Sequence, residues 1–248
     1  IIIMASTSET GHAKNVANFQ DLISFCTGYG ASYNPTNPRL TLAELENLYT
    51  TSQSKLQAVA NTKTSFDNAT NERSNAFADL KPLATRIVNS FAISGADPLA
   101  VDNAKSINKK LQGSSKRTTS DSDENSEETQ STNSISTSQQ SYDRLIDHLA
   151  NLIEVLVQNP LYSPNETELQ TATLQTKLQD LQTKNTNLIN AYTQYSNAMI
   201  DRNNTLYNPV TGLVQTSKEV KQYVKSVFGA KSPQYQQVSG LEFKVIKR

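Results

Sequence analysis

An internal repeat constrains the fold of this chain more than any other feature of its sequence. Residues 33–75 align with residues 162–204 at a constant shift of 129 without gaps, and 13 of these 43 positions are identical. Unrelated segments of this length would share roughly three or four identities, and a repeat of this size is a whole supersecondary unit. The fold must therefore accommodate two copies of one helical unit.

Both copies carry an apolar stripe whose members are separated by alternating steps of four and three residues. The stripe lies within residues 40–80 in the first copy and within residues 169–207 in the second. Such a spacing, sustained over five heptads, is typical of long helices that pack along one another. We predict one continuous long helix over each range. Pro82 and Pro209 follow these ranges and should interrupt the helices there, because proline breaks the helical hydrogen-bond ladder.

Shorter apolar segments with helical spacing flank each long helix. The predicted short helices cover residues 12–27, 83–91, 99–111, 142–158 and 213–228. The final segment, 241–247, alternates apolar and polar residues, which fits a short strand or an extended strap.

The segment between the two copies is almost entirely polar. Ile135 is the only aliphatic residue in 113–139, so this segment cannot bury enough apolar surface to offset its ordering entropy. We predict a first helical repeat over 1–112, a disordered low-complexity linker over 113–141 and a second helical repeat over 142–248, with the two repeats packing as one domain.

The fold class expected from these patterns is all-α. Each half exposes an apolar stripe that its own short helices cannot cover, so each is expected to complete the core of the other. The expected architecture is an elongated helical bundle, a coiled-coil-like internal duplication with pseudo-twofold symmetry. The sequence leaves open whether the two long helices run parallel or antiparallel.

Composition argues against several classes of function. The chain has 23 basic and 23 acidic residues and no net charge, which removes the electrostatic argument for nucleic acid or anionic lipid. No apolar run reaches the length of a transmembrane helix, and the lone Cys26 cannot form an internal disulfide. The polar residues after Met4 do not resemble a secretory signal. We read Met4 as the natural start, leave open whether Ile1–Ile3 are native, and expect a cytoplasmic protein.

Two arginines are the strongest candidates for a site. Arg73 and Arg202 occupy equivalent positions on the apolar stripes, where an unpaired arginine is costly. One interpretation is an anion or partner-carboxylate site, and the other, which we favour, is a fork that ties the helix to a neighbouring carbonyl or acid.

Four asparagines form a second set of candidates. Asn61 and Asn68 lie one heptad apart, as do their equivalents Asn190 and Asn197. Polar residues near a helical seam can fix register and oligomeric state, and we favour this structural role over ligand binding.

No catalytic, cofactor-binding or metal-binding residue is predicted. His12, His148 and Cys26 are the only soft metal ligands, and their spacing fits no metal motif. Phosphate-binding loops and nucleophile motifs are also missing from the sequence. We therefore expect no cofactor and no enzyme activity.

Two segments carry a resemblance to a protein family. Residues 10–19 (TGHAKNVANF) and 223–233 (YVKSVFGAKSP) resemble stretches of uncharacterised all-helical proteins of bacteroidete bacteria. The resemblance covers most of the chain outside the linker and implies a bacterial, cytoplasmic protein without an assigned activity.

The leading hypothesis is a non-enzymatic structural or scaffold protein that meets a protein partner or associates with itself, without nucleic acid or membrane. One alternative is a membrane-active or pore-forming helical protein, for which the moderately apolar 145–157 is the available hairpin segment. The other is a small-ligand or anion binder between the repeats, with Arg73 and Arg202 lining its pocket.

Overall fold

The computed structural model of the chain describes residues 7–113 and 140–246. Within these residues every regular element is helical, so the all-α prediction is confirmed. The expectations for Ile1–Met4 and for the linker over 114–139 lie outside the described residues.

The chain divides into two compact units. Unit 1 combines residues up to 66 with residues from 191 onward, and unit 2 comprises residues 67–190. The predicted halves, 1–112 and 142–248, describe the sequence repeat, whereas each compact unit takes helices from both halves.

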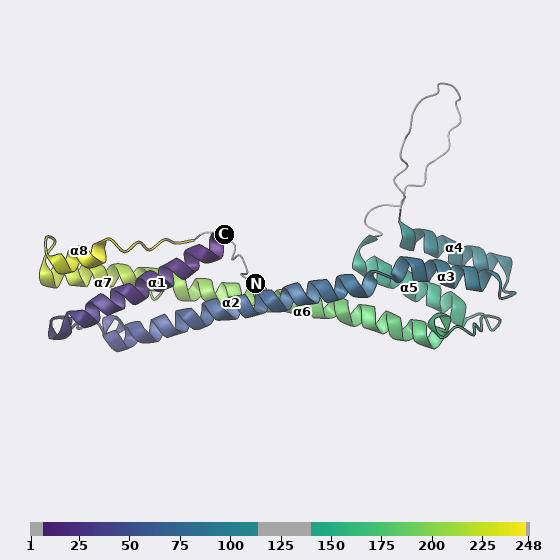
Figure 1. Cartoon of the computed structure of the whole chain (residues 1–248), viewed down its shortest axis with the longest axis horizontal. Coiled ribbons are helices and arrows are strands. Elements are labelled where there is room, and N and C mark those ends of the chain that lie inside the picture. Colours follow the sequence, from purple (N-terminus) through teal and green to yellow (C-terminus); the bar gives the residue numbers. More distant parts are fainter. Residues whose placement is uncertain (1–6, 114–139, 247–248) are drawn as a thin grey trace, which may run out of the picture. The chain divides into compact units, whose positions relative to one another are not determined.

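Unit 1 contains three complete helices and parts of the two long ones (Figure 1). The complete helices are α1 (Thr7–Gly28), α7 (Leu213–Phe228) and α8 (Pro233–Ser239). The first part of α2 (Leu42–Phe77) and the last part of α6 (Thr171–Tyr207) complete it. The short α8 was not predicted, although Ser232 before Pro233 is a typical helix start: the serine side chain accepts a hydrogen bond from Tyr235 N.

The core of unit 1 follows the apolar spacing of α1. Phe19, Leu22 and Cys26 are fully buried and pack with residues of α2, α6, α7 and α8, including Leu45 and Leu206. Full burial of a large apolar side chain stabilises a fold by about 1.5–3 kcal/mol. The core of unit 1 is therefore shared between residues of the first half and residues of the second.

The C-terminal segment 241–246 is an extended strap, one of the two predicted alternatives, because it contains no strand. The strap runs from α8 along α1 (Figure 1). The Asn15 side chain binds the Lys244 backbone on both sides, donating to the carbonyl at 2.7 Å and accepting from the amide at 3.0 Å. Asn18 donates to the Glu242 carbonyl at 2.7 Å. One face of α1 therefore holds the strap through side-chain amides.

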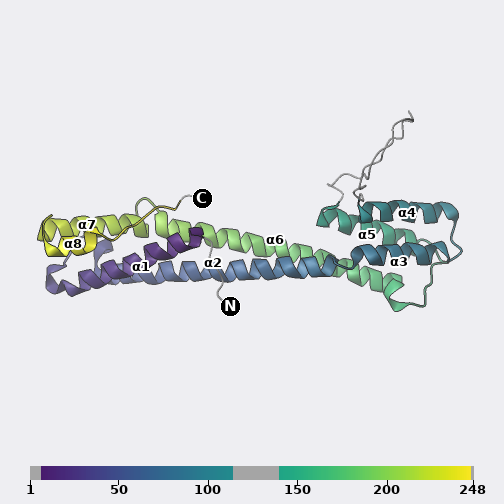
Figure 2. The same ribbon diagram turned by 45° about the horizontal axis from the view of Figure 1, so that its top comes forward.

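Unit 2 contains α3 (Leu80–Ala92), α4 (Pro98–Gln112) and α5 (Tyr142–Val157), together with the end of α2 and the beginning of α6 (Figure 2). The buried face of α5 repeats the spacing of α1, and Leu149 and Leu152 are fully buried against Phe91 and Leu111 among others. Gly95, with φ +83°, provides the left-handed residue in the α3–α4 turn.

The long helices have the predicted extent and are antiparallel in each unit, which the sequence left open. Successive contacts pair rising positions in α2 with falling positions in α6. In unit 1 these are Lys55 with Asp201 and Phe66 with Tyr195, and in unit 2 Glu72 with Lys184 and Asp79 with Lys177. The break after α2 precedes Pro82, which lies in the first turn of α3, where a missing amide donor is tolerated.

Candidate functional site

Several polar contacts join the first and second halves of the chain, and Arg73 is central to those in unit 2. Its Nη1 donates to Asn185 Oδ1 at 3.0 Å, and Asn185 Nδ2 donates to Asp143 Oδ1 at 2.7 Å. Arg73 comes from α2, Asn185 from α6 and Asp143 from α5. The buried amide of Asn185 therefore links the guanidinium to a carboxylate on a third helix.

The guanidinium of Arg73 also lies against an aromatic ring. Its Cζ is 3.9 Å from the ring centroid of Tyr142. The Tyr142 ring packs edge-to-face on the Phe77 ring, with 4.7 Å between the ring centroids. A cation over an aromatic face gains about 0.5–2 kcal/mol. Among the described residues, the buried Nε of Arg73 has no hydrogen-bond partner. The guanidinium of Arg73 therefore packs between helices of unit 2.

Arg202, the equivalent arginine in unit 1, is fully buried. Its Nε and Nη2 donate to Asn203 Oδ1 at 3.2 Å and 3.0 Å. The two arginines belong to different units, and neither lines the hollows of about 270, 270 and 470 Å³ on the described residues. Arg73 reaches an amide oxygen on another helix, whereas the hydrogen bonds of Arg202 described above stay within its own helix. The fork interpretation therefore stays a prediction for both arginines.

The four candidate asparagines all have exposed side chains: Asn61, Asn68, Asn190 and Asn197. Asn61 Oδ1 accepts a hydrogen bond from Gln57 Nε2 at 2.8 Å, one turn earlier in the same helix. Their positions therefore do not match the seam on which the register hypothesis depended.

A buried polar cluster in unit 1 was not predicted. His12 Nδ1 and the Tyr207 hydroxyl are 2.5 Å apart, and Asn15 Nδ2 donates to the same hydroxyl at 3.3 Å. Both His12 and Asn15 are buried. Little in the sequence indicated this cluster, because His12 and Asn15 fall between the apolar positions of α1. The one available signal was the repeat: 130 residues later, the equivalent positions hold Tyr142 and Leu145, which suggests a buried face.

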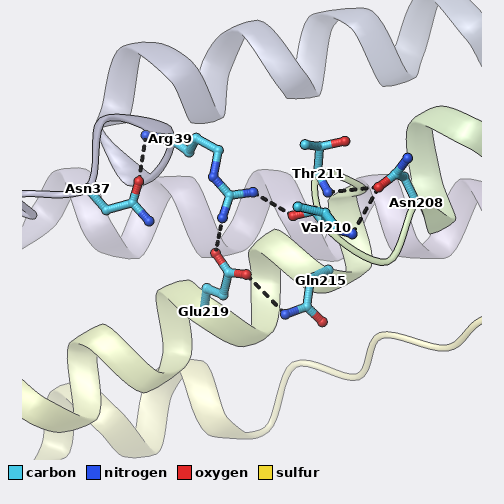
Figure 3. A network of polar contacts seen from close by, with 7 residues as sticks. All are labelled: Asn37, Arg39, Asn208, Val210, Thr211, Gln215 and Glu219. Atoms are coloured by element: carbon cyan, nitrogen blue, oxygen red, sulfur yellow. Dashed lines mark hydrogen bonds and ion pairs between the residues drawn. The ribbon is translucent and has the colours of Figure 1, made fainter.

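A second unpredicted contact joins the halves in unit 1 at Arg39, in the short 3-10 helix η2 (Pro38–Leu40). Arg39 Nη1 donates to the Val210 carbonyl, and Nη2 donates to Glu219 Oε2 at 3.0 Å (Figure 3). Glu219 Oε1 accepts from Gln215 Nε2 at 3.0 Å, one turn earlier in α7. The guanidinium thus fastens η2 to the turn between α6 and α7 and to α7 itself.

Unit 2 has an ion pair in the corresponding place. Arg86 Nη1 in α3 and Glu168 Oε2 in the 3-10 helix η4 (Thr167–Leu169) are 2.6 Å apart. The arginine is on the helix here and the carboxylate on the 3-10 turn, the reverse of unit 1. Aligning the repeat would have shown opposite charges at positions 39 and 168.

Over residues 7–113 and 140–246, no group of three or more His, Cys, Asp or Glu side chains could hold a metal ion. No described helix is both long enough and apolar enough to cross a bilayer. His148 is buried, and the loss of solvation lowers the pKa of its imidazole.

Comparison with known proteins adds no relative. No protein-family model, no curated protein and no solved structure matches the chain.

Proposed function

We propose that this protein is a non-enzymatic helical bundle that binds a protein partner, and that the end of unit 2 carries the binding surface. The α3–α4 turn and the segment after α5 lie at the same end of unit 2 (Figure 1). Ile93 is 87% exposed, Leu99 75% and Leu161 61%. Leu161 Cδ1 is 4.0 Å from the position that a Cβ on Gly95 would take, which places it beside the turn.

At the corresponding end of unit 1 the chain covers part of the apolar surface: Phe228 is half-buried, while Val227 beside it is 44% exposed. Phe228 precedes the helix-opening Pro233 by five residues, as Ile93 precedes Pro98. The Phe228 ring packs on Tyr29 with 5.1 Å between centroids. Position 159, which is equivalent to Tyr29 by the shift of 130, holds Asn159, whose amide binds the Val155 carbonyl. The exposed apolar group on unit 2, formed by Ile93, Leu99 and Leu161, carries the proposal because grouped exposed apolar side chains mark interaction sites.

The proposal is tested by a pull-down from the native cell with the intact protein and with an Ile93→Asp, Leu161→Asp variant. Captured proteins are identified by mass spectrometry, purified and titrated against both baits. We expect one partner whose affinity falls by about tenfold or more, because burial of these side chains is worth 1.5–3 kcal/mol each. Ile200→Asp is the matched control, since Ile200 is an exposed (54%) apolar residue of unit 1.

Thermal unfolding of each variant shows that the fold is intact. A partner that binds all three baits equally would contradict the location of the surface. Release of dye from liposomes by the purified protein would favour the membrane-active alternative instead.

A further inference from the structure

Ion pairs between the first and second halves of the chain occur in equivalent places in both units. Among them are one arginine pair and one lysine pair in each unit, with distances of 2.6–3.1 Å between nitrogen and oxygen. They are Arg39–Glu219 and Lys55–Asp201 in unit 1, and Arg86–Glu168 and Lys184–Glu72 in unit 2. The lysine pairs and the arginine pairs differ in whether equivalent positions of the two halves carry the same charge.

The lysine pairs have the same polarity in both units. Lys55 and Lys184 are equivalent by the shift of 129, and so are Glu72 and Asp201. Each half therefore carries both the lysine and the acid. Two copies of the same half, paired in the same way, would still place a lysine against an acid.

The arginine pairs have opposite polarity. Arg39 and Glu168 are equivalent by the shift of 129. Arg86 and Glu219 are equivalent by a shift of 133, which also matches the buried residues of α3 to those of α7. These matched buried pairs are Leu80 with Leu213, Ala84 with Ser217, Ile87 with Val220, and Phe91 with Val224. The first half thus carries two arginines at these positions and the second half carries two glutamates.

This difference determines which halves can pair. Two first halves would bring Arg39 against Arg86, and two second halves would bring Glu168 against Glu219. At these arginine and glutamate positions, opposite charges meet only when a first half pairs with a second half. Each exposed ion pair contributes little to stability, but like charges in direct contact oppose the wrong pairing.

We propose that these four residues make the two halves of this chain selective for each other, so that each half accepts the opposite half and rejects a second copy of itself. The polar network around Arg39 supports a fixed geometry for this recognition, because Glu219 is held by Gln215 and the Asn208 side chain accepts hydrogen bonds from the amides of Val210 and Thr211 (Figure 3). The occupant of each surface is the opposite half, from the same chain or from another copy.

The test uses the full chain, cleaved once at a protease site inserted between residues 114 and 139 and kept together as a complex of both fragments. The cleaved protein is unfolded in urea and refolded, and native mass spectrometry separates complexes of unlike fragments from complexes of like fragments by mass. We expect the unmodified protein to return only the complex of unlike fragments.

The decisive variant is Arg86→Glu with Glu168→Arg. The exchange preserves an ion pair in unit 2. It also makes each half complementary to a second copy of itself: the first half then carries Arg39 and a glutamate, and the second half carries Glu219 and an arginine. We expect complexes of like fragments to increase by about tenfold or more, because attraction replaces repulsion at both contacts. The matched control is Lys55→Glu with Asp201→Lys, which swaps as many charges but sets like charges against each other in both wrong pairings.

Complexes of like fragments from the unmodified protein would overturn the proposal, and so would a decisive variant that still returns only unlike fragments. If a cleaved protein does not refold from urea, prolonged incubation of the folded complex just below its unfolding temperature gives the same measurement by exchange. The expected and overturning distributions are the same in that experiment.

Discussion

At the scale of single residues, a tyrosine hydroxyl closes the same turn in each unit. Tyr33 donates to the Leu40 carbonyl at 2.7 Å and Tyr162 donates to the Leu169 carbonyl at 2.8 Å. Both bonds are buried, and the two tyrosines are equivalent by the shift of 129. The hydroxyl satisfies a carbonyl at the end of each 3-10 helix, immediately before a long helix begins.

Removal of either hydroxyl should destabilise the protein. We expect Tyr33→Phe and Tyr162→Phe each to lower the free energy of unfolding by about 1–3 kcal/mol, because a buried carbonyl loses its donor. Urea unfolding followed by circular dichroism measures the change. Tyr49→Phe is the control, since the Tyr49 hydroxyl accepts an exposed hydrogen bond from Gln53, and it should cost less than about 0.5 kcal/mol. Equal effects from all three variants would contradict the prediction.

The buried thiol of Cys26 predicts a pH dependence. Burial raises its pKa from 9.0 to about 12, and a hydrogen bond with Tyr33 opposes part of this rise. The folded thiol therefore keeps its proton at a pH where the unfolded thiol has lost it. The resulting contribution to stability is fully present below pH 9 and is lost as the pH rises from 9 towards 12, by up to about 1.4 kcal/mol per pH unit.

Urea unfolding of the wild type and of Cys26→Ala between pH 8 and pH 11 measures this effect. We expect the stability of the variant to fall less steeply above pH 9. Some slope should remain, because burial also raises the pKa of Tyr33. Parallel curves for the two proteins would show that Cys26 is not responsible.

At the scale of elements, the strap 241–246 is held by individual side chains of α1. Asn15→Ala should speed hydrogen exchange of the Lys244 amide by about tenfold or more, because its acceptor, Asn15 Oδ1, is removed. Exchange is measured by NMR at the single amide. Asn18→Ala is the control: Asn18 donates to the Glu242 carbonyl of the strap and not to the Lys244 amide, so the Lys244 amide should remain protected. Loss of protection in both variants would indicate that the strap detaches as a whole.

Most of the helices could be predicted from sequence because their apolar spacing is strong. The long helices α2 and α6 and the buried face of α1 follow the heptad and helical patterns directly. The strap could not be told from a strand, because the partner that distinguishes them, Asn15, lies more than two hundred residues away. The helix α8 was missed because seven residues carry too few apolar positions to show a period.

The polar site was only partly predictable. The stripe position of Arg73 indicated an arginine in helix packing, but its partners Asn185 and Tyr142 come from distant helices that no local pattern joins. The asparagines were placed near the seam, but each lies two residues past a stripe position (Val59, Phe66, Leu188 or Tyr195). Two residues turn a helix by about 200°, which puts these side chains on the opposite, exposed face. Arg39 and Glu219 were overlooked because exposed charges in turns and on helix surfaces are common.

At the scale of the whole molecule, each unit is completed by segments from both sides of residues 114–139. Cleavage of the chain within this segment should therefore leave the two fragments associated under native conditions, as one peak in size-exclusion chromatography. The thermal midpoint of the cleaved protein should rise with concentration, because unfolding now releases two chains. The intact chain is the control and should show no such dependence, whereas separate elution of the fragments would contradict the prediction.

The division into units also sets an order of events on the ribosome. Unit 2 is contiguous, so its residues are all available once position 190 has left the exit tunnel. Unit 1 cannot be completed until α7 and α8 have been synthesised. Until then, neither helix covers the apolar face of α1. A nascent chain that stalls late would therefore display Phe19 and Leu22 to chaperones while its middle is already folded.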